Sequence, residues 1–208
     1  MLSDGALDTA TVFRVLLKKT ERLALKFFER PAVELAPALL GCVLMHDETA
    51  GTIVETEAYL GVDDLAAHAS RGLTERTKVL FGPAGRAYVY FIYGMHECLN
   101  VVADHEGSAG CVLIRALEPL CGLEQMRARR NWNGPSCGLT NGPGKLTQAL
   151  AITRAHYGVR LDRGALTIRR WREQPEFAVA VTPRIGIREC ADWPLRFVWS
   201  GHPCLSKR

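Results

Sequence analysis

Two carboxylates and a phenol occupy alternate positions of one short segment, Glu55-Thr-Glu57-Ala-Tyr59. Alternate side chains of a strand share a face, so these three groups would line a cavity or the surface. We expect Ile53 on the same face and Val54 in the core. Two carboxylates roughly 7 Å apart could form the acid and base of glycosidic-bond cleavage, and their repulsion would raise one pKa. The alternative is a strand face exposed to solvent.

Arg115 interrupts the apolar run 112–117, VLIRAL. A guanidinium in such a run is rarely buried without an anionic partner. Two interpretations stay open. One is a structural ion pair, and the other is a contact with a catalytic carboxylate, a phosphate or a water molecule.

Aromatic side chains gather in the segment 87–95, AYVYFIYGM. Tyr88 and Tyr90 would share one strand face, and Tyr93 would reach a turn at Gly94 beside Met95. Ordinary sheet packing explains many such runs. Aromatic faces in a pocket can also stack on a nucleic-acid base, and a tyrosine at a turn can enter the base stack.

The stretch Gly142-Pro-Gly144-Lys145 resembles a phosphate-binding loop that opens a helix. It lacks the spacing of a P-loop and of a dinucleotide-binding fingerprint. A helix start with an incidental lysine is the alternative.

Composition indicates one soluble, intracellular domain. The 208 residues can bury a full core, and 48% of them are hydrophobic. No apolar run approaches the roughly 18 residues of a membrane helix, and Asp4 and Asp8 do not suit a signal peptide. Arginine makes up 20 of the 26 basic residues and the net charge is +4, which favours an anionic partner.

The seven cysteines are odd in number and include no Cys-x-x-Cys pair. We therefore expect reduced, buried thiols in preference to disulfides or a zinc site. The histidines lack metal-ligand spacing, and no metal or organic cofactor is expected.

Periodicity and turn residues predict a mixed α+β domain, with strands in the middle of the chain and helices around them. A short helix over about 64–68 would be capped by Asp63 or Asp64. Helices are predicted over about 11–28, 31–41, 122–130 and 145–152, and strands over 42–45, 52–60, 87–93, 99–103, 111–117, 165–169 and 184–188.

Five blocks together resemble one family. They are IVETEAYLG with the following Ala66-Ala67-His68, GRAYVYFIYGMHECLNV, CVLIRALEP, NGPGKLTQALAI and PRIGI. Across roughly residues 25–205 they resemble the alkyladenine (3-methyladenine) DNA glycosylase family, in its bacterial branch. The resemblance implies a single α+β domain around a curved antiparallel sheet with flanking helices, over residues 23–208, with residues 1–22 as an N-terminal extension or helix.

The resemblance also implies residue roles. Glu57 would be the general base that activates a water for attack on C1′ of the deoxyribose. Arg115 and a backbone carbonyl near Ile185 would hold that water. Glu55 would be structural.

The remaining implied roles concern the DNA. The pocket for the flipped base would comprise Tyr59, His68, Tyr90 and Asn100, with Asn100 screening against the amino group of guanine. Tyr93 would fill the gap in the duplex with Met95 beside it, and Tyr88, Lys145 and Arg76 would contact the backbone, unless Tyr88 only supports the pocket. His96 departs from the family pattern and leaves these loop contacts open.

The function so implied is that of a monofunctional DNA glycosylase. It would excise alkylated purines from damaged double-stranded DNA, as a cytoplasmic, nucleoid-associated monomer without a cofactor. The candidate lesions are 3-methyladenine, 7-methylguanine, hypoxanthine and ethenoadenine. A catalytically silent DNA-binding protein and a hydrolase of free nucleosides are the alternatives, and a bifunctional lyase is disfavoured because the chain has only six lysines.

Overall fold

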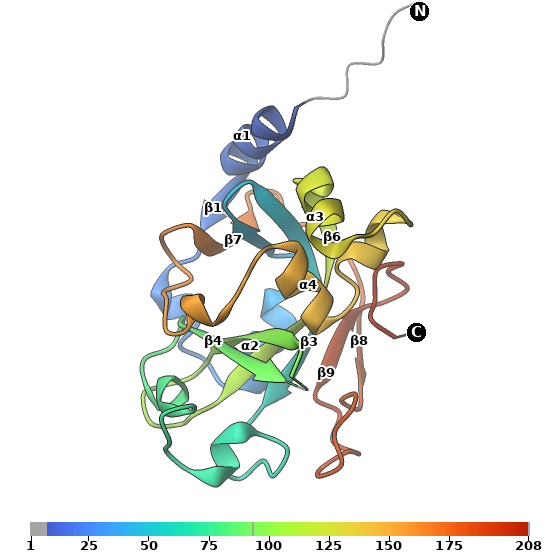
Figure 1. Ribbon diagram of the computed structural model, residues 1–208. Helices are drawn as coiled ribbons and strands as arrows, with labels where there is room; N and C mark the ends of the chain where they lie inside the picture. Colours follow the sequence, from blue (N-terminus) through green and yellow to red (C-terminus); the bar gives the residue numbers. More distant parts are fainter. Residues whose placement is uncertain (1–7, 93, 208) are drawn as a thin grey trace, which may run out of the picture.

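Two long strands, β3 (Thr49–Tyr59) and β6 (Cys111–Cys121), pair along their length at the centre of an antiparallel sheet (Figure 1). The computed structural model describes residues 8–92 and 94–207. Over these residues nine strands run in the order β1-β7-β2-β3-β6-β5-β4, with β9 also paired to β3 and β8 paired to β9. The other strands are β1 (Thr20–Arg22), β2 (Val43–His46), β4 (Ala87–Ile92), β5 (His96–Val102), β7 (Leu166–Trp171), β8 (Val179–Thr182) and β9 (Arg196–Trp199).

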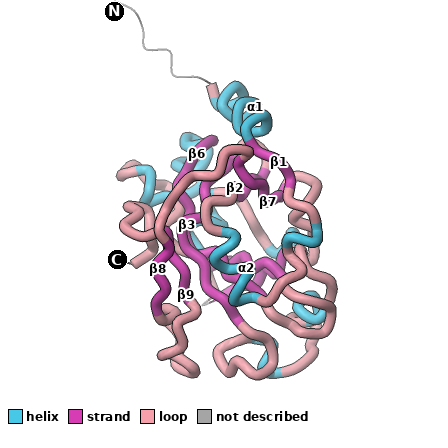
Figure 2. Tube along the Cα trace, turned by 180° about the vertical axis from the view of Figure 1, so that it is seen from behind, coloured by secondary structure: helices cyan, strands magenta, loops and turns pink. Residues whose placement is uncertain are grey.

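Four α-helices accompany the sheet within the described ranges: α1 (Thr9–Lys19), α2 (Ala32–Leu39), α3 (Leu123–Arg130) and α4 (Pro143–Ala149). Asp8 caps α1 through the amide of Thr11, and Pro31 and Pro143 supply the fixed φ that suits a helix start. Seen from behind, α2 lies across β3, whereas α4 lies toward the viewer in the opposite view (Figures 1 and 2). The predicted α+β class and its antiparallel sheet are confirmed.

Strand β3 changes its partner halfway along. Its first part pairs with β2 over Thr49–Thr52, and its second part pairs with β9 over Glu55–Glu57, while β6 stays on the other side. At this change Val54 has no partner on β6, and Arg115 has none on β3. Each is therefore the extra residue of a bulge, and bulges redirect side chains.

The bulge corrects the predicted faces of β3. Ile53 packs in the main core with Ala58, whereas Val54 packs with Ala116 and Cys204. Strict alternation had placed Ile53 with Glu55 and Glu57. The extra residue reverses the alternation between Ile53 and Glu57, so the carboxylates leave the core face while Ile53 remains in it.

The main core lies between the sheet and its helices. Leu35, Ala36 and Leu39 of α2 are fully buried against it, together with Leu146 of α4. The buried Thr56 hydroxyl donates a hydrogen bond of 2.9 Å to the carbonyl of Ala36 and so ties β3 to α2.

Some predicted elements differ from the structure. The helix expected to run to residue 28 ends at Lys19, because Thr20–Arg22 pairs with β7 in the sheet. No strand covers 184–188, and β8 and β9 were missed. The short 3-10 helix His68–Arg71 has no side-chain cap, since Asp64 is engaged elsewhere.

The expectation that the cysteines are reduced thiols and form no disulfide is wrong for two of them. Cys137 and Cys204 form a disulfide across 67 residues. Each stands alone in its own segment, so no local spacing pattern indicated the pair. The remaining five are free, and Cys42, Cys98, Cys111 and Cys121 among them are buried as expected.

None of the helices in the described ranges is long and apolar enough to cross a membrane. Residues 9–22 form α1 and β1, the latter at the edge of the sheet. The division of the chain at residue 22 stays a prediction.

Candidate active site

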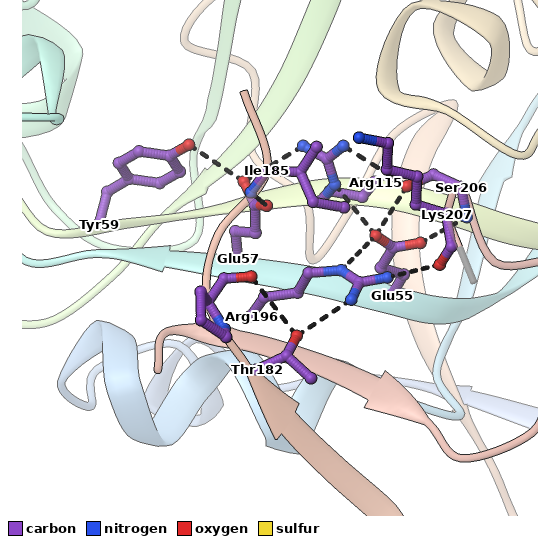
Figure 3. Close-up of polar contacts among 10 residues, drawn as sticks. Glu55, Glu57, Tyr59, Arg115, Thr182, Ile185, Arg196, Ser206 and Lys207 are labelled. Carbon is purple, nitrogen blue, oxygen red and sulfur yellow. Dashed lines mark hydrogen bonds and ion pairs between the residues drawn. The ribbon is translucent and has the colours of Figure 1, made fainter. Parts of the chain in front are cut away.

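Arg115 stands between the two carboxylates of β3 (Figure 3). Its Nε lies 3.1 Å from Glu55 Oε1, and its Nη1 lies 3.2 Å from Glu57 Oε2. Both carboxylates are fully buried, so neither strand face is open to solvent there. The anionic partner expected for Arg115 is thus confirmed, and it consists of two carboxylates that share one guanidinium.

Glu55 accepts four hydrogen bonds from three segments. Besides Arg115, Arg196 Nε donates to Oε1 at 2.8 Å, and the amide and hydroxyl of Ser206 each donate at 2.7 Å. Burial raises the pKa of Glu55, but these donors outweigh it and the resulting pKa lies below the ordinary value. Glu55 is therefore a fixed anion, which fits the structural role expected for it.

Glu57 has fewer compensating contacts. Its Oε1 accepts from the amide of Ile185 at 2.7 Å, and its Oε2 accepts from the Tyr59 hydroxyl at 3.1 Å as well as from Arg115. Burial dominates and raises the pKa of Glu57, although the charge of Arg115 opposes it. One carboxyl pKa is raised in the predicted direction, but the main cause is burial, and the repulsion from Glu55 that was expected to cause it contributes less.

A cavity of about 520 Å³ lies beside this pair. Glu57 does not reach its surface, but Tyr59, Arg115 and Ile185, which all contact Glu57, line it. The volume suits a small organic ring. The carboxylate therefore stands directly behind the wall of the cavity and can meet a molecule that enters between these three partners.

Aromatic rings form much of the cavity wall. Tyr59, His68 and Tyr90 all line it, and the His68 and Tyr90 ring centroids are 4.5 Å apart. Burial lowers the pKa of His68 to about 4, with the charges of Arg76 and Arg71 adding to the effect, so His68 is neutral at neutral pH. Burial raises the pKa of Tyr59 and keeps its phenol protonated as a donor to Glu57.

Two polar side chains complete the wall. Asn100 lines the cavity and donates to the carbonyl of Tyr88 at 3.3 Å. The Tyr88 hydroxyl lies 2.8 Å from His68 Nδ1. Tyr88 is 1% exposed, so it cannot reach a phosphate in this conformation and acts as a support for His68.

Of the residues expected to face DNA, Lys145 lies at this cavity. Lys145 and His96 line it, and Lys145 Nζ donates to Asn141 at 2.8 Å. A Cβ at Gly144 would lie 2.9 Å from His96 Cβ, so the start of α4 packs closely on β5 at this point.

Three further residues were expected to contact DNA. Arg76 is exposed, with its guanidinium carbon 5.3 Å from the Tyr90 ring centroid. Met95 is 68% exposed at the β4–β5 turn. Tyr93 lies outside the described residues.

Arg184 and Asp64 were missed from the sequence. They form a buried bidentate pair, with Arg184 Nη2 and Asp64 Oδ1 2.9 Å apart, and both side chains are fully inaccessible. The Arg184 guanidinium carbon lies 4.6 Å from the Tyr59 ring centroid. The two residues are 120 positions apart, so spacing gave no signal. Arg184 precedes Ile185, and the pair thus fixes two partners of Glu57.

In the described part of the chain, no three His, Cys, Asp or Glu side chains are grouped as metal ligands. What the arrangement offers is a buried carboxylate with a raised pKa, a shared guanidinium and stacking surfaces. A carboxylate of this kind can take a proton from water.

An antiparallel α+β sheet with a buried carboxylate behind an aromatic cavity is an arrangement that suits a hydrolytic enzyme. A family model described as "Methylpurine-DNA glycosylase (MPG)" matches residues 26–203. The chain belongs to this family of DNA glycosylases, enzymes that hydrolyse N-glycosidic bonds.

Curated relatives agree with this family. The chain is 51% identical over 188 residues to a protein of Methanoculleus marisnigri, covering 88% of this chain and 97% of that protein. It is 44% identical over 192 residues to one of Chlorobaculum tepidum, covering 90% and 91% of the two chains. It is 49% identical over 181 residues to one of Rhodopseudomonas palustris (strain HaA2), covering 87% and 88%. All three are provisionally named 3-methyladenine DNA glycosylases.

Proposed function

We propose that the protein excises 3-methyladenine, and a wider set of alkylated purines, from double-stranded DNA. The observation that carries this proposal is the buried Glu57 carboxylate in contact with Tyr59, Arg115 and Ile185, three residues of the cavity wall. The family match supports the DNA substrate, and the relatives' names support 3-methyladenine. Excision of 7-methylguanine, hypoxanthine and ethenoadenine extends the proposal.

Glu57 acts as the general base. A water molecule hydrogen-bonded to its carboxylate gives up a proton while its oxygen bonds to C1′ of the deoxyribose. The bond between C1′ and the purine nitrogen breaks, and its electron pair leaves with the base. An N-alkylated purine carries positive charge, so it departs as a neutral molecule and needs little further assistance.

The carboxylate has room for this water. Each carboxylate oxygen offers about two lone-pair directions. Oε1 accepts from Ile185, whereas Oε2 accepts from both Tyr59 and Arg115. Oε1 thus retains an acceptor direction for water. Arg115 is 3.2 Å from Glu57 and lines the cavity, so it stabilises the ionised base and can contact the same water.

Base recognition relies on the aromatic wall. A cationic purine stacks favourably on the electron-rich face of a tyrosine. Tyr59, His68 and Tyr90 offer such surfaces in the cavity, and the neutral state of His68 avoids repulsion of the cation. Asn100, which lines the same cavity, selects against the amino group of guanine in this proposal. The nucleotide must leave the duplex to enter, at a cost of a few kcal/mol that is smaller for a damaged base.

The decisive experiment is base release by Glu57→Gln. Duplex oligonucleotides that each carry one lesion are incubated with excess protein, and the free base is quantified by chromatography. Glutamine cannot accept the proton, so we expect release to fall about 100-fold or more. Glu106→Gln, at an exposed position, is the matched control and should match wild type. Release by Glu57→Gln at the wild-type rate would refute the base assignment.

The same panel separates the alternatives. A silent DNA-binding protein would bind the duplexes and release no base. A hydrolase of free nucleosides would act on small substrates independently of salt, whereas binding to DNA weakens steeply as salt rises. A bifunctional lyase would be trapped on DNA by borohydride. The proposed enzyme acts as a monomer in the cytoplasm at the nucleoid, without a metal or organic cofactor.

A further inference from the structure

The C-terminal segment Cys204–Lys207 closes over the fixed carboxylate of the site (Figure 3). The Ser206 amide donates to Glu55 Oε2 at 2.7 Å, and the Ser206 hydroxyl donates to Glu55 Oε1 at 2.7 Å. The Lys207 carbonyl accepts from Arg196 at 2.9 Å. The disulfide at Cys204 ties the beginning of the segment to Cys137. A segment with this many contacts has a defined position against the site.

Three donors converge on one oxygen of Glu55. Oε1 accepts from the Ser206 hydroxyl at 2.7 Å, from Arg196 at 2.8 Å and from Arg115 at 3.1 Å. A carboxylate oxygen has about two lone-pair directions, so the three donors compete. Arg115 makes the longest of the three bonds. The hydroxyl of Ser206 therefore weakens the hold of Glu55 on Arg115.

Arg115 contacts both carboxylates, because its Nε donates to Glu55 while its Nη1 donates to Glu57. A stronger pull from Glu55 draws the guanidinium away from Glu57. The direct contact from Arg115 Nη2 to the Ser206 hydroxyl is 3.4 Å long and weaker than the 2.7 Å bond to Glu55. Removal of the hydroxyl acts mainly through Glu55.

We propose that Ser206 is a positioning residue of the active site, which satisfies Glu55 and so leaves Arg115 available to Glu57. This inference rests on the proposed role of Glu57 as base. It assigns the C-terminal segment to the catalytic apparatus, although Ser206 does not line the cavity and its side chain bonds to Glu55 and Arg115 and not to Glu57. Arg115 opposes the rise in the pKa of Glu57 caused by burial, so loss of Ser206 raises that pKa further.

The test is the pH profile of base release under single-turnover conditions. For Ser206→Ala we expect the acid limb to move upward by about half a pH unit, with the rate above that limb within about twofold of wild type. Ser206→Thr keeps the hydroxyl and should restore the wild-type profile. Ser200→Ala removes an exposed hydroxyl and should leave the profile unchanged. An unshifted limb, or an equal loss of rate at every pH, overturns the proposal.

A second measurement is independent of catalysis. The pH titration of the Glu57 carboxyl carbon, followed by NMR in wild type and Ser206→Ala, should show the same upward shift. If wild type releases no base from any duplex, the proposed function fails while this titration still decides the inference. If Ser206→Ala does not fold, Ser206→Cys places a weaker donor at the same position and carries the same prediction. Identical Glu57 titrations in wild type and the variant would contradict it.

Discussion

Glu55 and Glu57 differ in their environment although they are two positions apart on one strand. Glu55 accepts from two guanidinium groups and from both donors of Ser206, whereas Glu57 shares one guanidinium and depends on single contacts from Tyr59 and Ile185. The environment of Glu55 therefore stabilises its ionised form, whereas burial destabilises the ionised form of Glu57. This destabilisation raises the pKa of Glu57 and so makes its carboxylate a better proton acceptor.

The raised pKa of Glu57 predicts an acid limb in the rate of base release. The protonated carboxyl cannot accept a proton from water, so the rate should fall as the pH decreases through this pKa, at a pH above the ordinary glutamate value of 4.5. Single-turnover rates between about pH 4 and 8 measure the limb. A rate that stays constant down to pH 4.5 would argue against Glu57 as the base.

The two carboxylates should also respond oppositely in stability. A pKa raised by folding means that Glu57 stabilises the fold when protonated, and that this stability is lost as pH rises through its folded pKa. Glu55, with a lowered pKa, stabilises the fold above its unfolded pKa, and this stability is lost as pH falls through its folded pKa. At pH 7, Glu55→Gln should therefore lower the free energy of unfolding by about 3 kcal/mol, whereas Glu57→Gln should change it by less than about 1 kcal/mol.

Urea unfolding of both variants at pH 7 checks this contrast. An equal fall in the free energy of unfolding in the two variants would show that the fold stabilises both ionised carboxylates to the same extent.

The sequence was sufficient to find most of the residues that meet at the site. Strand alternation placed Glu55, Glu57 and Tyr59 together, and the interrupted apolar run identified Arg115. It did not place Ile53 and Val54, because an extra residue in a bulge leaves no mark in a hydrophobic pattern.

At the scale of elements, the loop at Asp64 and the loop at Arg184 hold Tyr59 and Ile185 in place. Each contributes one partner of a fully buried ion pair. Asp64 also accepts from the amides of Leu60 and Ala66. The sequence pattern predicted Asp63 or Asp64 as a helix cap and residues 184–188 as a strand, because a pair joined only in three dimensions has no period along the chain.

Removal of Asp64 should therefore be costly. Asp64→Ala leaves the Arg184 guanidinium buried without its anion, and we expect the free energy of unfolding to fall by about 3–5 kcal/mol. Asp63→Ala, at the exposed neighbouring position, is the control and should lie within about 0.5 kcal/mol of wild type. Chemical denaturation measures both. A loss of less than about 1 kcal/mol in Asp64→Ala would mean that the ion pair contributes little.

At the scale of the molecule, the disulfide joins the segment around Ser136–Leu139 to the C-terminal segment. A covalent link across 67 residues restricts the unfolded chain more than the folded one. We expect Cys137→Ala to lower the free energy of unfolding by about 2–4 kcal/mol under oxidising conditions. Reduction of the wild type with dithiothreitol should have the same effect.

Cys190→Ala serves as the matched control, because Cys190 is free and only partly buried. Urea unfolding with and without reductant makes the comparison. If the reductant leaves the urea concentration at the midpoint of wild-type unfolding unchanged, the disulfide does not constrain the unfolded chain as expected.

The overall architecture was predictable in class and in its central strands. The sequence predicted the α+β class and the core of β2 through β6. It did not predict that β9 pairs with the second half of β3, because the short strand Arg196–Trp199 lies far along the chain from its partner.

Because β3 changes its partner at a bulge, the number of residues in the strand decides which side chains face the site, just as their identities do. Because Val54 is the extra residue, the first half of β3 packs Ile53 in the core, while the second half holds Glu57 on the opposite face, behind the cavity wall. Substitutions at Val54 that keep its bulk leave this geometry intact. Loss of one residue between Val54 and Glu57 would leave this bulge in place and turn Glu57 toward the core, so that an otherwise unchanged carboxylate would lie on the wrong face of the sheet.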